Sequence, residues 1–192
     1  SATYTLLATN SAGNSADATV SLTVNAAVPS LSYAGATGTS GSVGSAMSVS
    51  PTTLTANGAS ITACGIKSGS TPSSLPAGLS VNASTCVISG TPTSPAGSAT
   101  YTLVATNSAG NSANATVSLT VAAQAPTLSY ASSTGTTGTV GTAMSVTPST
   151  LSANGAAISA CGIKAATTAL PAGLSVNAST CVISGTPTAV TA

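Results

Sequence analysis

The chain has almost no charged side chains. Its 192 residues include two Lys and one Asp, and there is no Arg, Glu or His. Charged residues make up 2% of the sequence, whereas an ordinary soluble domain has about 25%. General acid–base catalysis needs paired groups with different pKa values, and one carboxylate without histidine cannot supply such a pair. The composition therefore predicts that the protein is not an enzyme and has no catalytic residues.

The same shortage argues against several kinds of binding. A calcium site takes several carboxylate oxygens, and Asp17 is the only acidic side chain. Nucleic-acid binding needs a basic face and aromatic platforms, but the chain has no Trp and no Phe. We therefore expect no metal, no cofactor and no nucleic acid.

Long apolar runs are also missing. No stretch approaches the roughly 18 apolar residues of a membrane-spanning helix, so we expect no membrane span. The apolar fraction of 42% is nevertheless sufficient for a folded core. A nearly neutral Ser, Thr and Ala surface favours self-association, because charge repulsion normally keeps soluble domains apart. The alternative is a secreted domain of low charge that stays dilute.

What the chain does contain is a long internal repeat. Ser1–Val24 returns with two substitutions as Ser98–Val121, 97 residues later, and Leu75–Thr93 returns unchanged as Leu170–Thr188, 95 residues later. A period of this size fits one β-sandwich domain and exceeds that of solenoid repeats. The first residues match the segment that should close such a domain. We therefore expect either a stretch of a longer array or a subunit that a neighbouring copy completes.

Strand periodicity runs through the repeat. In Ala99–Thr106 and Ala115–Val121 one set of alternate positions is apolar and the other is mostly Thr or Ser, which is typical of half-buried antiparallel strands. The loop Asn107–Asn111 between them predicts a hairpin, and Ser1–Val24 should form the same hairpin. No segment has helical periodicity. Further strands are predicted at Val140–Val146, Ala156–Lys164, Leu174–Val176 and Cys181–Ser184.

These elements predict an all-β fold of tandem immunoglobulin-like β-sandwiches, with about seven antiparallel strands in each unit. Residues 1–25 are expected to be the C-terminal hairpin of a preceding Ig-like unit. Residues 26–121 are expected to form a complete Ig-like domain. Residues 122–192 are expected to form an Ig-like unit that lacks its last hairpin.

Four cysteines recur at matching places in the two units. Cys64 and Cys86 are 22 positions apart, and Cys161 and Cys181 are 20 positions apart. The even number and the repetition predict two local disulfides, Cys64–Cys86 and Cys161–Cys181. A metal site is the alternative, but each unit lacks His and any third or fourth ligand. Disulfides indicate an oxidising compartment, so we expect an extracellular or cell-surface protein.

The complete unit contains an ordered set of short motifs. The segment LPAGL comes first and is followed by a short strand, then by ISGTP, and then by a hairpin of the YTLVATNSAGNS kind. This order resembles the immunoglobulin-like tandem repeats of bacterial surface and secreted proteins, and the Cys positions resemble the disulfide-bearing subset of that family. The resemblance covers nearly the whole chain and implies an extracellular tandem architecture. Members of the family serve as adhesins, stalks, spacers and appendages to enzymes. This chain differs from them in having almost no charge.

Together the residues predict a structural extracellular protein, the repeating unit of a bacterial surface filament or stalk built head to tail from Ig-like domains. The expected partner is another copy, whose Leu128–Pro187 region the hairpin Ser1–Val24 would complete, unless the units are covalently continuous. The side chains predicted to make this contact are Tyr4, Leu6, Val20, Leu22 and Val24.

Two alternatives remain open. The first is an adhesin repeat that binds a receptor or glycan through the loop Gly35–Gly44 or its match Ser132–Gly141. The second is a spacer array within a large secreted protein.

Overall fold

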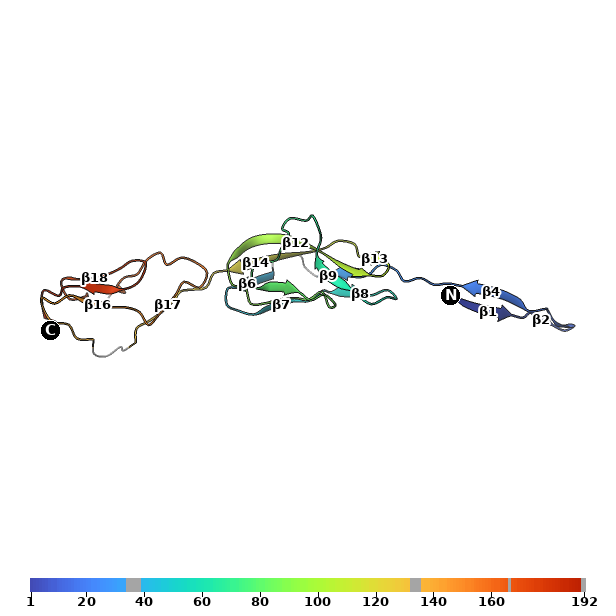
Figure 1. Ribbon diagram of the computed structural model, residues 1–192, viewed down its shortest axis with the longest axis horizontal. Coiled ribbons are helices and arrows are strands. Elements are labelled where there is room, and N and C mark those ends of the chain that lie inside the picture. The colour runs from blue at the N-terminus through green and yellow to red at the C-terminus, as the bar shows by residue number, and fades with distance from the viewer. Residues whose placement is uncertain (34–38, 132–135, 166, 191–192) are drawn as a thin grey trace.

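The computed structural model describes residues 1–33, 39–131, 136–165 and 167–190. All regular elements within these ranges are β-strands, which confirms the all-β class. Figure 1 shows an elongated molecule in which an N-terminal hairpin, a central domain and a C-terminal unit follow one another along the long axis.

The N-terminal part is a single hairpin, as its alternating pattern predicts. Strand β1 (Ala2–Leu6) pairs antiparallel with β4 (Ala18–Leu22), and the short strands β2 (Thr9–Asn10) and β3 (Gly13–Asn14) continue the hairpin to its tip. The tip points away from the central domain (Figure 1).

The central domain is built around the long strands β12 (Ala96–Asn107) and β14 (Ala115–Ala122), which form the matching hairpin. Their sheet has the order β13-β12-β14-β6, and β9 also pairs with β12. A second sheet has the order β10-β11-β7, and β5 pairs with β8. The other strands are β5 (Ser30–Ser32), β6 (Thr39–Ser42), β7 (Met47–Val49), β8 (Thr53–Thr55), β9 (Ala63–Ile66), β10 (Leu79–Val81), β11 (Ile88–Gly90) and β13 (Gly110–Asn111).

The alternation of the hairpin strands decides where the core lies. Every second side chain of β14 is buried, and the same holds for β12 from Tyr101 onward. Six of these side chains, Tyr101, Leu103, Ala105, Ala115, Val117 and Leu119, pack in one cluster with Leu31, Tyr33 and Ile88. The hairpin therefore supplies a large share of the core of the central domain.

The C-terminal unit repeats the second sheet and the β5–β8 pair of the central domain. Its sheet has the order β16-β19-β18, and β15 pairs with β17. The strands are β15 (Thr127–Ser129), β16 (Met144–Val146), β17 (Thr150–Ser152), β18 (Leu174–Val176) and β19 (Ile183–Gly185).

Besides the hairpin strands β12, β13 and β14, two further strands of the central domain, β6 and β9, have no counterpart among the described residues of this unit. Residues 136–139 and 160–163 match β6 and β9, and both segments are described without strand structure. The predicted strand Ala156–Lys164 is therefore wrong, and the predicted strand Val140–Val146 is confined to Met144–Val146. The reason is that β6 pairs with β14 and β9 pairs with β12. Without a hairpin, neither segment has a neighbouring strand among the described residues with which to pair.

The segment Gly35–Gly44, which the adhesin alternative takes as a binding loop, is partly a strand. Residues 35–38 and 132–135 lie outside the described residues, but Thr39–Ser42 forms β6 and pairs with β14. This pair is parallel, in contrast to the antiparallel strands that were expected. The part of the predicted binding loop that the structure describes is therefore largely a strand of the sheet.

Candidate assembly site

The site begins with the buried face of the hairpin in the central domain. Tyr101 and Leu103 of β12 are 4% and 0% exposed, and the inward side chains of β14 are equally buried. They contact side chains of the opposite sheet, including Met47, Val49 and Leu79. This face shows what a bound hairpin contributes to an Ig-like unit of this sequence.

The N-terminal hairpin has the same face without a partner. Tyr4 and Leu6, which match Tyr101 and Leu103, are 51% and 54% exposed. The five side chains predicted to make the assembly contact are all among the exposed large hydrophobic residues of the chain: Tyr4, Leu6, Val20, Leu22 and Val24. An apolar face of this kind is normally covered in a folded protein.

The two hairpins also share their internal geometry. Tyr4 pairs with Val20 in the same register in which Tyr101 pairs with Val117. Near the tip, the hydroxyl of Thr9 donates a 2.7 Å hydrogen bond to Asn14, and Thr106 donates one of the same length to Asn111. The N-terminal hairpin therefore has the same internal geometry as its copy in the central domain.

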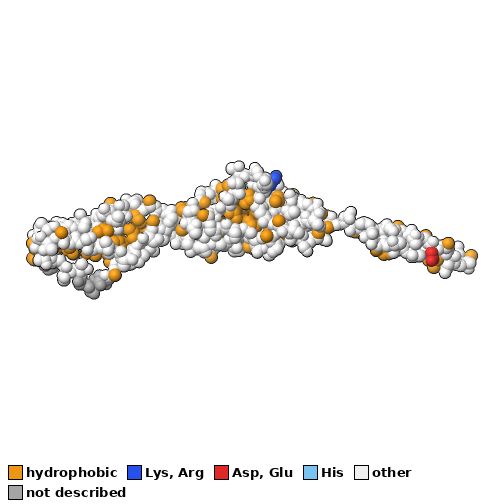
Figure 2. Space-filling model, in the orientation of Figure 1, with side chains coloured by type: hydrophobic (Ala, Val, Ile, Leu, Met, Phe, Trp, Pro, Cys, Tyr) orange, Lys and Arg blue, Asp and Glu red, His pale blue; other side chains and the backbone are white. Residues whose placement is uncertain are grey.

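The C-terminal unit has an open apolar surface. A groove of about 920 Å³ is open there, and Figure 2 shows hydrophobic side chains gathered along the middle of this unit. The apolar lining includes Tyr130, Val140, Met144, Val146, Leu174 and Ile183. In the central domain, the matching side chains Tyr33, Met47, Val49, Leu79 and Ile88 pack around the hairpin.

Exposure confirms that this unit lacks the cover that its copy has. Leu128 is 52% exposed, whereas the matching Leu31 is 8% exposed. The unpaired segments 136–139 and 160–163 provide the two edges to which hairpin strands bind in the central domain. The groove therefore offers both apolar contact and strand pairing.

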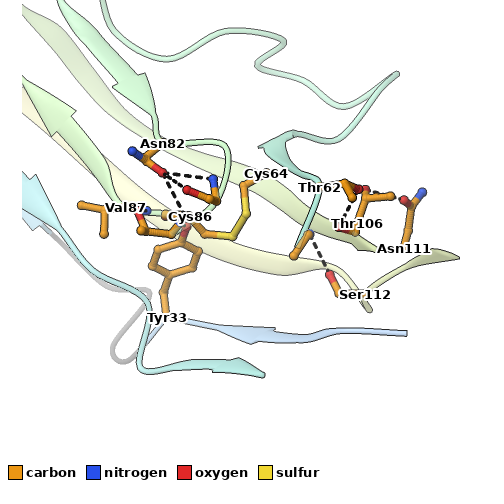
Figure 3. The surroundings of a disulfide bond; sticks show 12 residues. Tyr33, Thr62, Cys64, Asn82, Cys86, Val87, Thr106, Asn111 and Ser112 are labelled. Atoms are coloured by element: carbon orange, nitrogen blue, oxygen red, sulfur yellow. Dashed lines mark hydrogen bonds between the residues drawn. A yellow bond between two sulfur atoms is a disulfide. The ribbon is translucent and has the colours of Figure 1, made fainter. Parts of the chain in front are cut away.

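A disulfide anchors one of these edges in each unit. Cys64 on β9 is bonded to Cys86, with 5.2 Å between their Cα atoms, and Cys161 is bonded to Cys181 with the same Cα separation. These are the two pairs that the repetition predicts. Because Cys86 lies just before β11, the bond joins the two sheets of the central domain (Figure 3). In the C-terminal unit, the bond ties the segment 160–163 to the rest of the fold.

The turn that carries the second cysteine is held by hydrogen bonds. The Tyr33 hydroxyl donates to the carbonyl oxygen of Cys86, and Tyr130 makes the same bond to Cys181. Asn82 accepts bonds from the amides of Ser84 and Thr85 in this turn (Figure 3). Burial raises the pKa of Tyr33 to about 12 and also raises the pKa of Tyr101. Tyr33 and Tyr101 are therefore side chains of the core of the central domain.

The part of the chain that the structure describes contains no group of three or more His, Cys, Asp or Glu side chains placed to hold a metal ion. Nor does any helix of the described residues have the length and apolarity needed to cross a membrane.

The fold defines a tandem arrangement of immunoglobulin-like β-sandwich units. The family described as Putative Ig domain matches residues 29–122 and again residues 125–192. The chain belongs to this family, and the two matches form a tandem pair. A search of curated proteins finds no match.

Proposed function

We propose that the protein is the repeating structural unit of an extracellular bacterial filament or stalk, assembled head to tail from Ig-like domains. The observation that carries this proposal is the complementarity of the two ends. An apolar hairpin face is exposed at one end, and at the other end a groove is open in a unit whose copy holds that same hairpin. The hairpin of one copy would fill the groove of the next, unless the units are covalently continuous in a longer array.

Several properties of the chain support assembly of this kind. Strand addition supplies backbone hydrogen bonds at both edges and buries the apolar face of the hairpin. A head-to-tail contact that does not close into a ring gives a filament. The scarcity of charge means that copies approach one another with little electrostatic repulsion. On this account the protein is not an enzyme, and its partner is itself.

The disulfides indicate the cellular compartment of the protein. Disulfide-bonded Ig-like domains are typical of proteins outside the reducing cytosol, and two such bonds brace this chain. The protein is therefore non-cytoplasmic. We extend this to the cell surface, where a filament or stalk would act.

Variants of the hairpin face test the proposal. Leu6→Ser combined with Leu22→Ser removes two side chains of the apolar face and should abolish concentration-dependent growth in light scattering. The matched control is Thr3→Asn with Thr19→Asn, on the opposite face, because the corresponding Thr100 and Thr116 lie on the outer face of the hairpin in the central domain. Growth that is equal for both variants would contradict docking of the hairpin. A chain that stays monomeric at every concentration would leave an adhesin repeat or a spacer as its function.

A further inference from the structure

A second contact is built into the joint between consecutive units. Where the central domain meets the C-terminal unit, the loop Asn154–Gly155 lies against the preceding domain. A Cβ atom added to Gly155 would lie 2.9 Å from Cγ2 of Val43 and 3.2 Å from Cδ of Pro95. The Val43 side chain therefore packs directly on the glycine backbone, and only glycine fits there without a shift.

Hydrogen bonds fix the same joint. The amide of Gln124 in the linker donates to the carbonyl oxygen of Asn154 at 3.0 Å, and the Asn154 side chain donates to the carbonyl oxygen of Ala125 at 2.7 Å. The Gln124 side chain also donates to Ser45 of the central domain at 2.9 Å. The linker is thus clamped to both units, which is unlike a flexible tether.

The central domain carries the same loop at its other end. Asn57 and Gly58 have φ angles of 52° and 90°, close to the 46° and 95° of Asn154 and Gly155. The amide of Ala27 donates to the carbonyl oxygen of Asn57 at 3.0 Å, and the Asn57 side chain donates to the carbonyl oxygen of Val28 at 2.7 Å. A Cβ atom on Gly58, however, would have only Ala26 within 4 Å, at 3.6 Å and 3.7 Å. The loop Asn57–Gly58 therefore has the conformation of Asn154–Gly155, but no described side chain of a preceding unit packs on its glycine.

The residues that could make this contact lie in the C-terminal unit. Val140 and Val190 occupy the positions that match Val43 and Pro95, and they are 47% and 85% exposed. Both residues line the groove that the hairpin would fill. A hairpin docked there would bring its own linker, and the loop Asn57–Gly58 that follows it, to this end of the unit.

We infer that the loop Asn57–Gly58 of one copy docks on Val140 and Val190 of a second copy, in the way that Asn154–Gly155 docks on Val43 and Pro95 within the chain. This inference rests on the proposed head-to-tail assembly and adds a second surface to it. The joints between copies then equal the joint within each copy. A filament built in this way repeats along its axis with the length of one Ig-like domain.

The variant Gly58→Val tests the contact. In the free chain a Cβ atom at this position has only Ala26 within 4 Å, whereas in the joint the valine side chain would overlap Val140. We expect the concentration needed for half-maximal assembly to rise by about tenfold or more, because overpacking of a close contact is strongly unfavourable. The matched control is Gly69→Val. Gly69 has a φ of 75°, and a Cβ atom added to it would have nothing within 4 Å, so the variant carries similar backbone strain away from the joint.

A second substitution makes the test reciprocal. Val140→Ala shortens the opposing side chain and should restore most of the assembly of Gly58→Val when it is present in the same chain. Thermal unfolding of Gly58→Val and Gly69→Val should show similar midpoints, which separates a lost contact from a lost fold.

The outcomes separate this contact from hairpin docking itself. If Gly58→Val assembles as well as Gly69→Val, the loop contact does not exist, although the hairpin still docks. An axial repeat of two alternating domain spacings in images of the fibres would contradict equivalent joints in the same way. If the unchanged chain and the Gly69→Val control both fail to assemble, the proposed function fails and the loop has no partner in a second copy.

Discussion

Tyr4 and Tyr101 occupy the same position of the same hairpin, yet one is 51% exposed and the other is 4% exposed. Their cross-strand neighbours, Val20 and Val117, are in matching register. The difference therefore lies in what covers the hairpin and not in its conformation. The C-terminal unit lacks the other half of this contact. It has the side chains that pack against the hairpin in the central domain, but its described residues form no hairpin of this kind.

Assembly should create strand structure in the C-terminal unit. The segment Ala160–Ile163 has the sequence of β9 but is not a strand. We expect its amides to exchange with deuterium at least about tenfold more slowly in fibres than in single chains, because hairpin docking supplies the missing partner. Hydrogen exchange read by mass spectrometry checks this, with β16 (Met144–Val146) as a segment already paired in both states. Equal exchange of Ala160–Ile163 in both states would argue against strand addition.

Matched substitutions should separate folding from assembly. Leu103→Ala removes a fully buried side chain and should destabilise the central domain by about 2–5 kcal/mol. Leu6→Ala changes the equivalent but exposed position and should alter the stability of the single chain by less than about 0.5 kcal/mol, while weakening assembly. Denaturant unfolding and light scattering measure the two effects. A large loss of stability from Leu6→Ala would mean that the N-terminal hairpin already packs within its own chain.

Stability should fall in strong alkali and be nearly constant from about pH 5 to 9, where few groups of this chain titrate. Burial raises the pKa of Tyr33 to about 12, whereas a phenol in the unfolded chain has a pKa of 10.0. The unfolded state therefore loses this proton first, and the free energy of unfolding decreases as the pH rises from about 10 to 12. Tyr33→Phe should reduce this slope in unfolding experiments at different pH values.

The Tyr33→Phe variant should also lower the free energy of unfolding at neutral pH. It leaves the carbonyl oxygen of the buried Cys86 without its hydroxyl donor, so a loss of about 1–3 kcal/mol is expected at pH 7. Tyr4→Phe is the control, because Tyr4 is exposed in the single chain. An alkaline slope that is unchanged by Tyr33→Phe would assign the transition to another group.

Reduction of the disulfides should lower thermal stability. Cys161 and Cys181 close a loop with a sequence separation of 20, and a crosslink over a loop of this size stabilises by about 3 kcal/mol in the chain-entropy model. Calorimetry before and after reduction measures the shift of the midpoint. A midpoint that does not move, after mass spectrometry has verified reduction, would contradict a stabilising role for these bonds.

The hairpins were predictable from the sequence because their signal is local. Alternation of apolar and polar residues in Ala99–Thr106 and Ala115–Val121 fixes both the strands and their buried face. The repeat then identifies Tyr4, Leu6 and Val20 as copies of core residues. Sequence alone thus indicated the candidate side chains of the hairpin.

The strands that depend on a distant partner were not predictable in this way. The four residues Ala63–Ile66 form β9, whereas the identical Ala160–Ile163 do not form a strand. Thr39–Ser42 has no strand-like alternation and becomes β6 only beside β14. Tertiary pairing decides both cases. The joint at Gly155 was missed for a similar reason, since only the structure shows that Val43 reaches its backbone.

Electron microscopy of the concentrated chain, followed by electrophoresis after boiling in detergent, tests the head-to-tail account most directly. The account predicts regular unbranched fibres that dissociate into single copies of the chain that was assembled. It also predicts that Leu6→Ser with Leu22→Ser gives single particles under the same conditions. Single particles of the unchanged chain at every concentration, or fibres that the hairpin variant forms equally well, would contradict it.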